Sequence, residues 1–276
     1  MYIIKYNFEV SAYIIFFNNQ DTITKAVDSL LNQTIPLKRI ILIDDCSTDR
    51  SCELVSKYNV ELVKNKRNMG RGYSRNLAHK LLKSRFVLSL DATNTIPTNF
   101  VEKSIHWFSD RQVGAIYGRI TQQNIKTLSD SWRGIHLFND DIPQEININH
   151  TFISYGSIVR KKSYELTSGY NKFLTHNEDV DLGESMIKSG FKIIFDPSLI
   201  VISSSHSGVF KTLERYARWN SGFKERPSLR NYIKNILFSV KCMCLRDFKS
   251  KRYSCILVSL ICPHFHFLYQ LKKYFK

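Results

Sequence analysis

The first 120 residues alternate between short apolar runs and longer stretches with apolar residues at helical spacing. The runs VSAYIIFF (10–17) and RIILID (39–44) are short and rich in β-branched residues, which predicts buried strands. The same signal predicts three more strands, in VELVK, RFVLSLD and VGAIYG. Helices are predicted between the strands, at 21–33, 71–82 and 99–110. This alternation predicts an α/β fold whose mostly parallel sheet is covered by helices on both faces.

The pattern changes in the second half of the chain. Residues 119–150 lose the alternation and are expected to be irregular or mixed. Order returns after residue 150, and HNEDVDLGESMIKSG is expected to be helical from about Val180. A strand in FKIIFD, a turn at Pro197 and the strand-like run LIVISSSH (199–206) are expected to follow.

Polar side chains follow three of the predicted strands. Asn18 follows the first strand, Asp44 and Asp45 close the second, and Asp91 closes the fourth. Ligands of parallel sheets bind beyond the carboxyl ends of the strands, so these side chains are expected to line one crevice. The alternative for Asp44 and Asp45 is helix capping in the turn DDCSTD. Two adjacent acids exceed what a cap needs, which favours a binding role.

Length and cysteine spacing narrow the class of protein. A chain of 276 residues suits one sizeable domain, with room for a small appendage. Its six cysteines match neither a zinc site nor a disulfide framework, which predicts reduced thiols. The beginning MYIIKYNFEV lacks the pattern of a signal peptide, so a cytoplasmic location is expected.

The net charge of +16 is concentrated near the C-terminus. Residues 209–276 hold 15 Lys or Arg and 3 acidic residues, which gives +12 in a quarter of the chain. Such a segment favours an anionic partner, either phospholipid or nucleic acid. No nucleic-acid recognition module is present, and an acidic crevice would repel a phosphate backbone, so nucleic acid is not expected as a partner.

The segment YSCILVSLICPHFHFLYQL (253–271) is apolar and aromatic and has basic residues on both sides. This pattern favours a helix that lies in the headgroup region of a membrane surface. A buried terminal helix with a solvated basic face is the alternative.

Six motifs, in this order along the chain, together resemble the family 2 glycosyltransferases, which are inverting sugar-nucleotide enzymes with the GT-A fold, a Rossmann-like α/β fold. They are VSAYIIFFNNQDTITKAVDSLLNQ, IILIDDCSTDRS, NMGRGYSRN, LSLDAT, NEDVDLGESMIKSG and RYARWNSG. The resemblance implies a GT-A domain over 1–222, with a donor half at 8–118 and an acceptor half at 119–222. A basic helical tail at 223–276 follows.

The resemblance also implies a reaction. A sugar would pass, with inversion, from a nucleoside-diphosphate sugar to a hydroxyl of a glycan or lipid-linked acceptor. A UDP-sugar is the favoured donor. The basic, low-glycine composition, rich in Asn, Lys and Ile, is similar to that of enzymes of bacterial surface-polysaccharide synthesis. A degenerate relative that binds without turnover is the alternative.

For the donor, the resemblance places the nucleotide base near Phe17, Asp45 and Arg75, with Asn18 and Asp44 beside them. Phe17 would offer a stacking face, with core packing as the alternative.

The metal-binding DxD motif of the family would be read at Asp91-Ala92-Thr93, where Thr93 replaces the second carboxylate. Mg²⁺ and Mn²⁺ prefer carboxylate oxygens, so this change predicts weakened cation binding. A cation could still bind through Asp91, the donor diphosphate and His206. The alternatives are a reaction that needs no metal and a loss of activity.

The resemblance assigns the general base to Asp179, with Glu178 and Asp181 in supporting roles. An acidic first helical turn is the alternative for all three. Arg218 and Trp219 match a segment of the family that contacts the donor diphosphate or the acceptor, although an amphipathic helix also explains them. Acceptor contact is also expected from the loop Gly156–Arg160.

Overall fold

The computed structural model describes residues 8–174, 176–220 and 227–275. The chain forms two compact units. The first, called the sheet unit here, consists of Met1–Ile120 and Gln144–Ser204, and the second, the helical unit, of Thr121–Pro143 and Ser205–Lys276.

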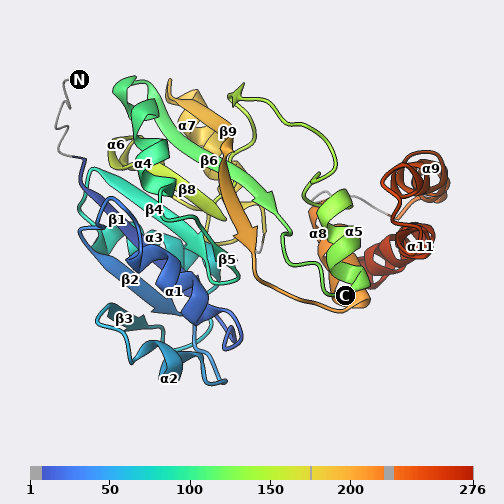
Figure 1. Ribbon diagram of the computed structural model, residues 1–276, viewed down its shortest axis with the longest axis horizontal. Helices are drawn as coiled ribbons and strands as arrows, with labels where there is room; N and C mark the ends of the chain where they lie inside the picture. Colours follow the sequence, from blue (N-terminus) through green and yellow to red (C-terminus); the bar gives the residue numbers. More distant parts are fainter. Residues whose placement is uncertain (1–7, 175, 221–226, 276) are drawn as a thin grey trace. The chain divides into compact units, whose positions relative to one another are not determined.

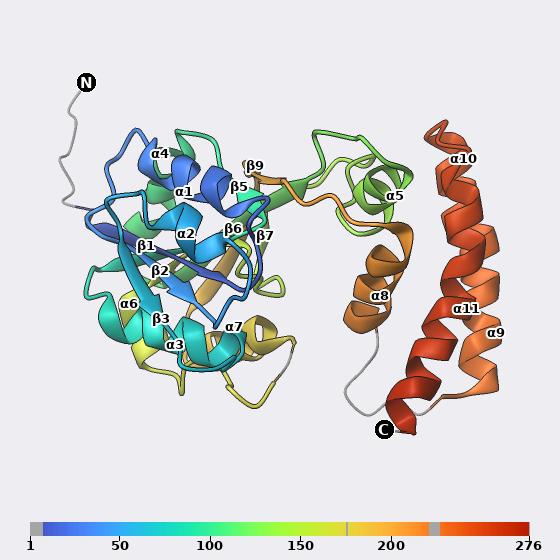
Figure 2. The same cartoon turned by 90° about the horizontal axis from the view of Figure 1, so that it is seen from below.

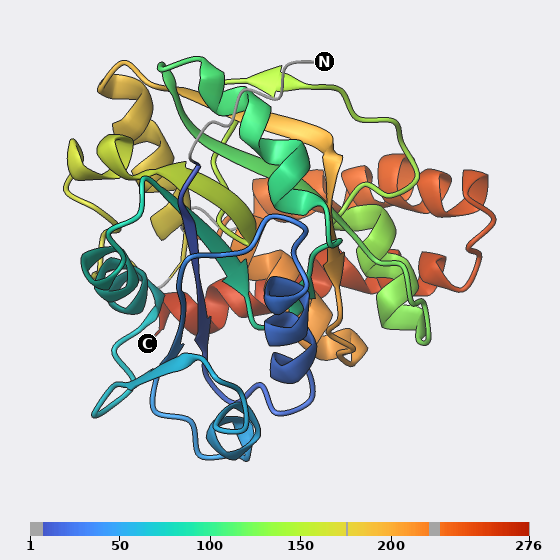
Figure 3. The same ribbon diagram turned by 60° about the vertical axis from the view of Figure 1, so that its left-hand side comes forward.

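The sheet unit contains a mixed sheet whose N-terminal part is parallel (Figures 1 and 3). Strands β3 (Glu61–Lys64), β2 (Ile40–Asp44), β1 (Val10–Phe16) and β4 (Phe86–Asp91) lie in that order and pair in parallel. Both β4 and β6 (Val113–Thr121) are antiparallel to β8 (Gly156–Arg160), so β6 runs in the direction of the first four strands. The remaining strands are β9 (Lys192–Ser203), β5 (Asn94–Thr95) and β7 (Asn147–Ile148). The predicted α/β architecture is confirmed, with an antiparallel second part that the alternation did not reveal.

Alternate residues of the strands build a core on each face of the sheet. Even-numbered β1 residues such as Ala12 and Ile14 pack with α1 (Ile23–Leu31), α4 (Phe100–Ser104) and the 3₁₀ helix η1 (Ile105–Ser109). The odd-numbered Tyr13 packs on the other face with α3 (Arg71–Leu81). On that second face, α7 (Glu178–Lys188) covers β6 and β8. The period of two along each strand thus explains why both faces are covered. Helices α2 (Ser51–Val55) and α6 (Lys161–Glu165) complete the unit.

The turn predicted at Pro197 is wrong. Strand β9 is continuous through this residue, which lies between the β9 residues that pair with β7 and those that pair with β5. A proline is tolerated in a strand where no ladder hydrogen bond requires its missing N–H. Within the stretch expected to be irregular, the structure also places a helix, α5 (Leu128–His136), which begins with a capping box between Thr127 and Asp130.

The helical unit joins α5 to the C-terminal quarter of the chain. It contains α8 (Val209–Asn220), α9 (Leu229–Phe238), the π-helix η2 (Ser239–Cys244), α10 (Leu245–Lys249) and α11 (Cys255–Tyr274). Its core combines Trp132 of α5 and Leu213 of α8 with Met243, Val258 and Cys262. The predicted basic helical extension is therefore confirmed as helical.

The expected domain boundary at 222 does not coincide with this division. Residues 121–143 and α8 belong to the same unit as the C-terminal helices, because their apolar side chains share one core with α11. Ser221 and Gly222, at the end of the RYARWNSG motif, lie outside the described residues. Across the described part of the chain, no helix is both long and apolar enough to cross a bilayer. All six cysteines are free.

Candidate active site at the carboxyl edge of the sheet

The register of the parallel strands brings the predicted polar residues to one edge. Asp44 pairs with Phe16 at the end of β1, and Asp91 pairs with the preceding residue, Ile15. The ends of β1, β2 and β4 are therefore level, which is the arrangement expected from their order in sequence. Phe17 follows directly and is 44% exposed, so an aromatic ring lies at this edge in contact with solvent.

Asp45 organises the loop that leads into α3. Its Oδ1 accepts hydrogen bonds from the backbone N–H of Met69 and from Asn65 Nδ2, both at 2.8 Å, and its Oδ2 accepts one from Gly70 N at 2.9 Å. Gly70 has φ of +83°, a conformation that glycine adopts at little cost. The carboxylate thus occupies the amides at the start of α3, where an anion would otherwise be favoured.

Asp44 and Asn18 hold the neighbouring turn. Asp44 Oδ1 accepts from Ser47 N at 2.8 Å, and its Oδ2 accepts from the Cys52 thiol at 2.8 Å. Burial, with a further contribution from Asp44, raises the pKa of Cys52 to about 11, so the thiol stays protonated and can donate. Asn18 Oδ1 accepts from Thr48 N at 2.8 Å. Capping-type bonds, the alternative considered for Asp44, are therefore present, and its contact with a donor stays a prediction.

Arg75 connects Asp91, which is predicted to contact the donor, to Glu178, one member of the predicted catalytic pair. Its side chain is 2% exposed, and Nη1 donates to Glu178 Oε1 at 2.5 Å while Nη2 donates to Asp91 Oδ1 at 3.1 Å. Burial alone would lower the pKa of Arg75, but the charges of Glu178 and then Asp91 raise it above its ordinary value. The arginine is thus a permanently charged bridge between two carboxylates 87 residues apart in sequence, at positions 91 and 178.

Asp179 lies next to this bridge, in the first turn of α7. Asn177, with φ of +62°, directly precedes that helix, and Glu178 and Asp179 are its first two residues. Asp179 Oδ2 accepts from both the N–H and the hydroxyl of Ser154, at 3.1 and 3.2 Å. Its Oδ1 accepts from Val180 N at 3.0 Å. These bonds fix the orientation of a partly exposed carboxylate at the N-terminus of a helix, where negative charge is favoured.

The segment Ser154–Tyr155 is a part of the site that sequence reasoning missed. Ser154 binds Asp179, and the carbonyl oxygen of Tyr155 accepts from Asp91 N at 3.4 Å and from Asn94 Nδ2 at 3.0 Å. This segment therefore links the predicted base to the strand end that carries Asp91. The one signal in the sequence for Ser154–Tyr155 was its position directly before Gly156, where acceptor contact was expected.

Three of the predicted residues belong to the helical unit. His206 Nδ1 lies 2.7 Å from Asp130 Oδ2, within that unit, so Nε2 is the ring nitrogen left for a metal. Arg218 is partly buried on α8, and Trp219 beside it is 45% exposed. The Arg75 bridge, Asp179 and the strand ends all belong to the sheet unit. The roles expected for His206, Arg218 and Trp219 stay predictions.

The described residues around Asp91 do not by themselves form a cation site. Asp91 is the one carboxylate of the Asp91-Ala92-Thr93 segment, and one of its oxygens binds Arg75. Among the described residues, no cluster of three His, Cys, Asp or Glu side chains has the spacing of a metal site. A divalent cation prefers several oxygen ligands, so most of them would have to come from the donor.

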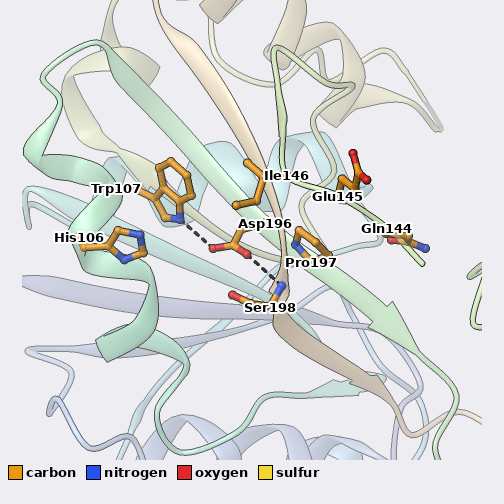
Figure 4. A pocket seen from close by; sticks show the side chains of 8 residues that line it. All are labelled: His106, Trp107, Gln144, Glu145, Ile146, Asp196, Pro197 and Ser198. Carbon is orange, nitrogen blue, oxygen red and sulfur yellow. Dashed lines mark hydrogen bonds between the residues drawn. The ribbon is translucent and has the colours of Figure 1, made fainter. Parts of the chain in front are cut away.

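A separate hollow of about 640 Å³ is lined by residues of η1, β9 and the segment 144–146 (Figure 4). Trp107 Nε1 donates to Asp196 Oδ2 at 2.8 Å, and Asp196 Oδ1 accepts from Ser198 N. None of the predicted site residues lines it.

An aromatic cluster supports α3 beneath the Arg75 bridge. His79 is fully buried and stacks on Tyr164 with ring centroids 3.9 Å apart, near Tyr13 and Tyr170. Burial, and then the charges of Lys161 and Arg75, lower the pKa of His79 to about 3. The imidazole is therefore neutral in the folded protein at pH 7.

This pKa predicts acid sensitivity. Unfolded His79 takes up a proton below about pH 6.5, whereas the folded form does so only near pH 3, so protonation favours unfolding in that window. Between pH 6.5 and 4.5, protonation of this group lowers the free energy of unfolding of the wild type by up to ~1.4 kcal/mol per pH unit. In His79→Leu the free energy of unfolding is therefore expected to depend less on pH in this range. Urea titrations at several pH values would measure the free energy of unfolding. His106→Leu, at an exposed histidine, is the control. Equal slopes in His79→Leu and wild type would contradict the assignment.

Several known proteins are similar to this chain in sequence. The family described as Glycosyl transferase family 2 matches residues 11–167. The UDP-Glc:alpha-D-GlcNAc-diphosphoundecaprenol beta-1,3-glucosyltransferase WfaP of Escherichia coli is 33% identical over 107 residues, 38% of this chain and 43% of that protein. The corresponding WfgD enzyme of the same organism is 25% identical over 231 residues, 78% of this chain and 87% of that protein. The Poly(ribitol-phosphate) beta-glucosyltransferase of Bacillus spizizenii is 33% identical over 109 residues, and the match spans only 17% of its length.

Solved structures share the fold. The mannosyltransferase PcManGT of Pyrobaculum calidifontis, in complex with GDP-Man and Mn²⁺, aligns over 96% of this chain and 87% of its own, with a TM-score of 0.64 and 14% identity. S. aureus TarS 1–349 in complex with UDP-GlcNAc aligns over 96% and 89%, with a TM-score of 0.57 and 15% identity. These similarities confirm the predicted GT-A-type fold. With more than half of its residues matched by the family, the chain belongs to glycosyl transferase family 2.

Proposed function

We propose that this glycosyltransferase moves a sugar from a UDP-sugar to a hydroxyl of a glycan or lipid-linked acceptor, with inversion and with Asp179 as the general base. The observation that carries the proposal is the Arg75 bridge, which holds Asp91 and Glu178 while Asp179 follows directly in sequence. Asp91, proposed for the donor side, and Glu178, proposed for the catalytic side, are thus joined through Arg75 on the sheet unit.

In the proposed reaction, Asp179 takes the proton of the acceptor hydroxyl while the hydroxyl oxygen attacks the anomeric carbon of the donor sugar. The new bond joins that carbon to the acceptor oxygen, and the bond to the diphosphate oxygen breaks on the opposite face. The nucleoside diphosphate leaves with the bonding electrons, so the stereocentre inverts in one displacement. Ser154 orients the base through Oδ2, and Glu178 positions the start of α7 through its bond to Arg75.

Donor recognition is proposed for the edge formed by β1 and β2. The exposed ring of Phe17 offers a face on which a nucleobase can stack. Asp45 would act by fixing the loop before α3, and Asn18 and Asp44 by fixing the turn at 46–49. The relatives WfaP and WfgD carry UDP-Glc in their names, and TarS was solved with UDP-GlcNAc, which supports a UDP-sugar.

Gly156–Arg160, expected as an acceptor-side loop, forms the buried strand β8 in the middle of the sheet, so acceptor contact is not proposed there. For Arg218 and Trp219 of α8, contact with the donor diphosphate or the acceptor is proposed. Two relatives are named for an acceptor linked to diphosphoundecaprenol, a lipid carrier. We therefore place the reaction in the synthesis of a cell-envelope polysaccharide at the cytoplasmic face of a membrane.

Mg²⁺ or Mn²⁺ is proposed as a weakly held cofactor, with Asp91 of the sheet unit as the protein ligand. Thr93→Asp would complete the DxD pattern and is expected to lower the Mn²⁺ concentration for half-maximal activity by about tenfold, because a second carboxylate adds a charged oxygen ligand. Activation titrations would measure the change. Thr98→Asp, at an exposed threonine nearby, is the matched control. Full wild-type activity in excess EDTA would contradict a required cation.

A binding screen tests the proposal. UDP-sugars and GDP-sugars would be titrated calorimetrically against the full chain, with and without Mn²⁺, and turnover would then be measured with the tightest donor. Saturable binding of a UDP-sugar followed by turnover is expected. Binding without turnover would favour the degenerate alternative, and absence of any nucleotide binding would contradict the donor site.

A further inference from the structure

Helices α9 and α11 of the helical unit lie side by side (Figure 2). The Tyr232 hydroxyl and His264 Nδ1 are 2.6 Å apart, and the Tyr232 ring stacks on Phe267 with centroids 4.6 Å apart. The two helices therefore pack against each other, and their exposed side chains are together called the α9/α11 surface here.

This surface carries a stripe of exposed apolar side chains. On α11, Leu257, Ile261 and Leu268 are exposed, by 62%, 40% and 64%. Their spacing of four and seven residues places them on one side of the helix. On α9, Leu229, Ile233 and Leu237 recur every four residues and are also exposed, which gives that helix a second stripe.

The opposite side of α11 is already buried. Cys255, Val258 and Cys262 pack against Trp132 in the core of the helical unit. The core therefore accounts for one side of the helix and leaves the Leu257 stripe unexplained. A terminal helix that needed only to cover this core would be expected to have a polar outer side.

The charge around the stripe has one sign. The exposed basic residues of this region are Arg230, Lys234, Lys241, Lys249, Lys251, Lys272 and Lys273. Within 227–275 the single acidic residue is Asp247, which is 0% exposed and bonds to Ser259 Oγ and His136 Nε2. The outer surface thus combines apolar side chains with uncompensated positive charge.

We propose that the α9/α11 surface docks on an anionic phospholipid bilayer, with both helices lying in the headgroup region. Apolar stripes flanked by Lys and Arg are the pattern of interfacial helices, which bury their apolar side about 5–10 Å deep. A second copy of this chain would bring like charges together. A nucleic-acid backbone would match the charge but would not cover the leucines. The purpose of docking, delivery of the enzyme to a lipid-linked acceptor, rests on the proposed function, whereas the docking itself does not.

Vesicle flotation with the full chain tests this inference. Wild type is expected to float with vesicles of phosphatidylcholine and phosphatidylglycerol, and much less with phosphatidylcholine alone. Replacing Arg230, Lys234 and Lys241 by Gln is expected to weaken partitioning on the order of 100-fold at low salt, since each charge contributes about five-fold. The difference should shrink in 1 M salt. Replacing Leu257, Ile261 and Leu268 by Gln should weaken partitioning at least about ten-fold at any salt.

The matched control replaces exposed apolar residues of the sheet unit, Leu31, Ile148 and Leu166, by Gln and should float as wild type does. Melting temperatures would verify that every variant is folded. Equal flotation of control and stripe variants would overturn the inference, as would a stable dimer in light scattering that the stripe variant converts to a monomer. UDP-sugar binding, measured in the same samples, separates the two proposals. A chain that floats with vesicles but does not bind a UDP-sugar would contradict only the proposed function. A chain that binds a UDP-sugar but does not float would contradict only the proposed docking.

Discussion

Asp179→Asn is expected to lower turnover by about 10²–10⁴-fold, the usual contribution of a general base, while the donor dissociation constant stays within about two-fold of wild type. Asparagine keeps the size of the side chain and an oxygen that can accept from Ser154, but it cannot take the proton of the acceptor hydroxyl. Steady-state kinetics with saturating acceptor, together with calorimetric titration of the donor, measure the two effects separately.

Glu184→Gln is the matched control for this prediction. Glu184 is an exposed acid on the same helix and lies 3.8 Å from Lys188, so its loss removes a similar charge without touching the site. Its turnover is expected to remain within about two-fold of wild type, because exposed ion pairs contribute little. Comparable turnover in Asp179→Asn and wild type would show that another group acts as the base.

Arg75→Met is expected to lower the free energy of unfolding by about 3–5 kcal/mol and to abolish activity. The change leaves Glu178, which is 2% exposed, as a buried carboxylate without its ion-pair partner. Urea unfolding followed by circular dichroism gives the stability. Adding Glu178→Gln to the same chain should recover part of the loss, since the buried charge is then removed.

The exposed pair of Arg50 and Glu53 provides the comparison for this second experiment. Arg50 Nε lies 2.8 Å from Glu53 Oε2, yet both side chains are more than half exposed, so Arg50→Met should cost no more than about 1 kcal/mol. A similarly small cost for Arg75→Met would mean that the buried bridge does not support the site.

Local patterns were sufficient for the parts of the fold that depend on neighbouring residues. The apolar runs and helical spacings identified β1 to β4, α1 and α3, and the parallel arrangement followed from their alternation. Because parallel strands end at one edge, the position of Asp44 and Asp91 at the same edge of the sheet could also be predicted.

Contacts between distant segments could not be predicted in the same way. Nothing local to Arg75 indicates that it pairs with Glu178, and nothing local to Ser154 indicates that it binds Asp179. The helical unit is assembled from 121–143 and 205–276, so a boundary drawn along the chain could not describe it. Asp45 is a second case. The pair of adjacent acids at the end of β2 predicted a ligand contact, whereas the oxygens of Asp45 accept hydrogen bonds from the backbone before α3.

Real-time proton NMR of the slow hydrolysis of an α-linked UDP-sugar, with water in place of the acceptor, tests the central claim most directly. The anomeric proton of the released sugar reports its configuration before mutarotation. A direct displacement promoted by Asp179 predicts that the β-anomer appears first and that Asp179→Asn releases almost none. An α-anomer formed first, or equal release by the variant, would contradict the proposed mechanism.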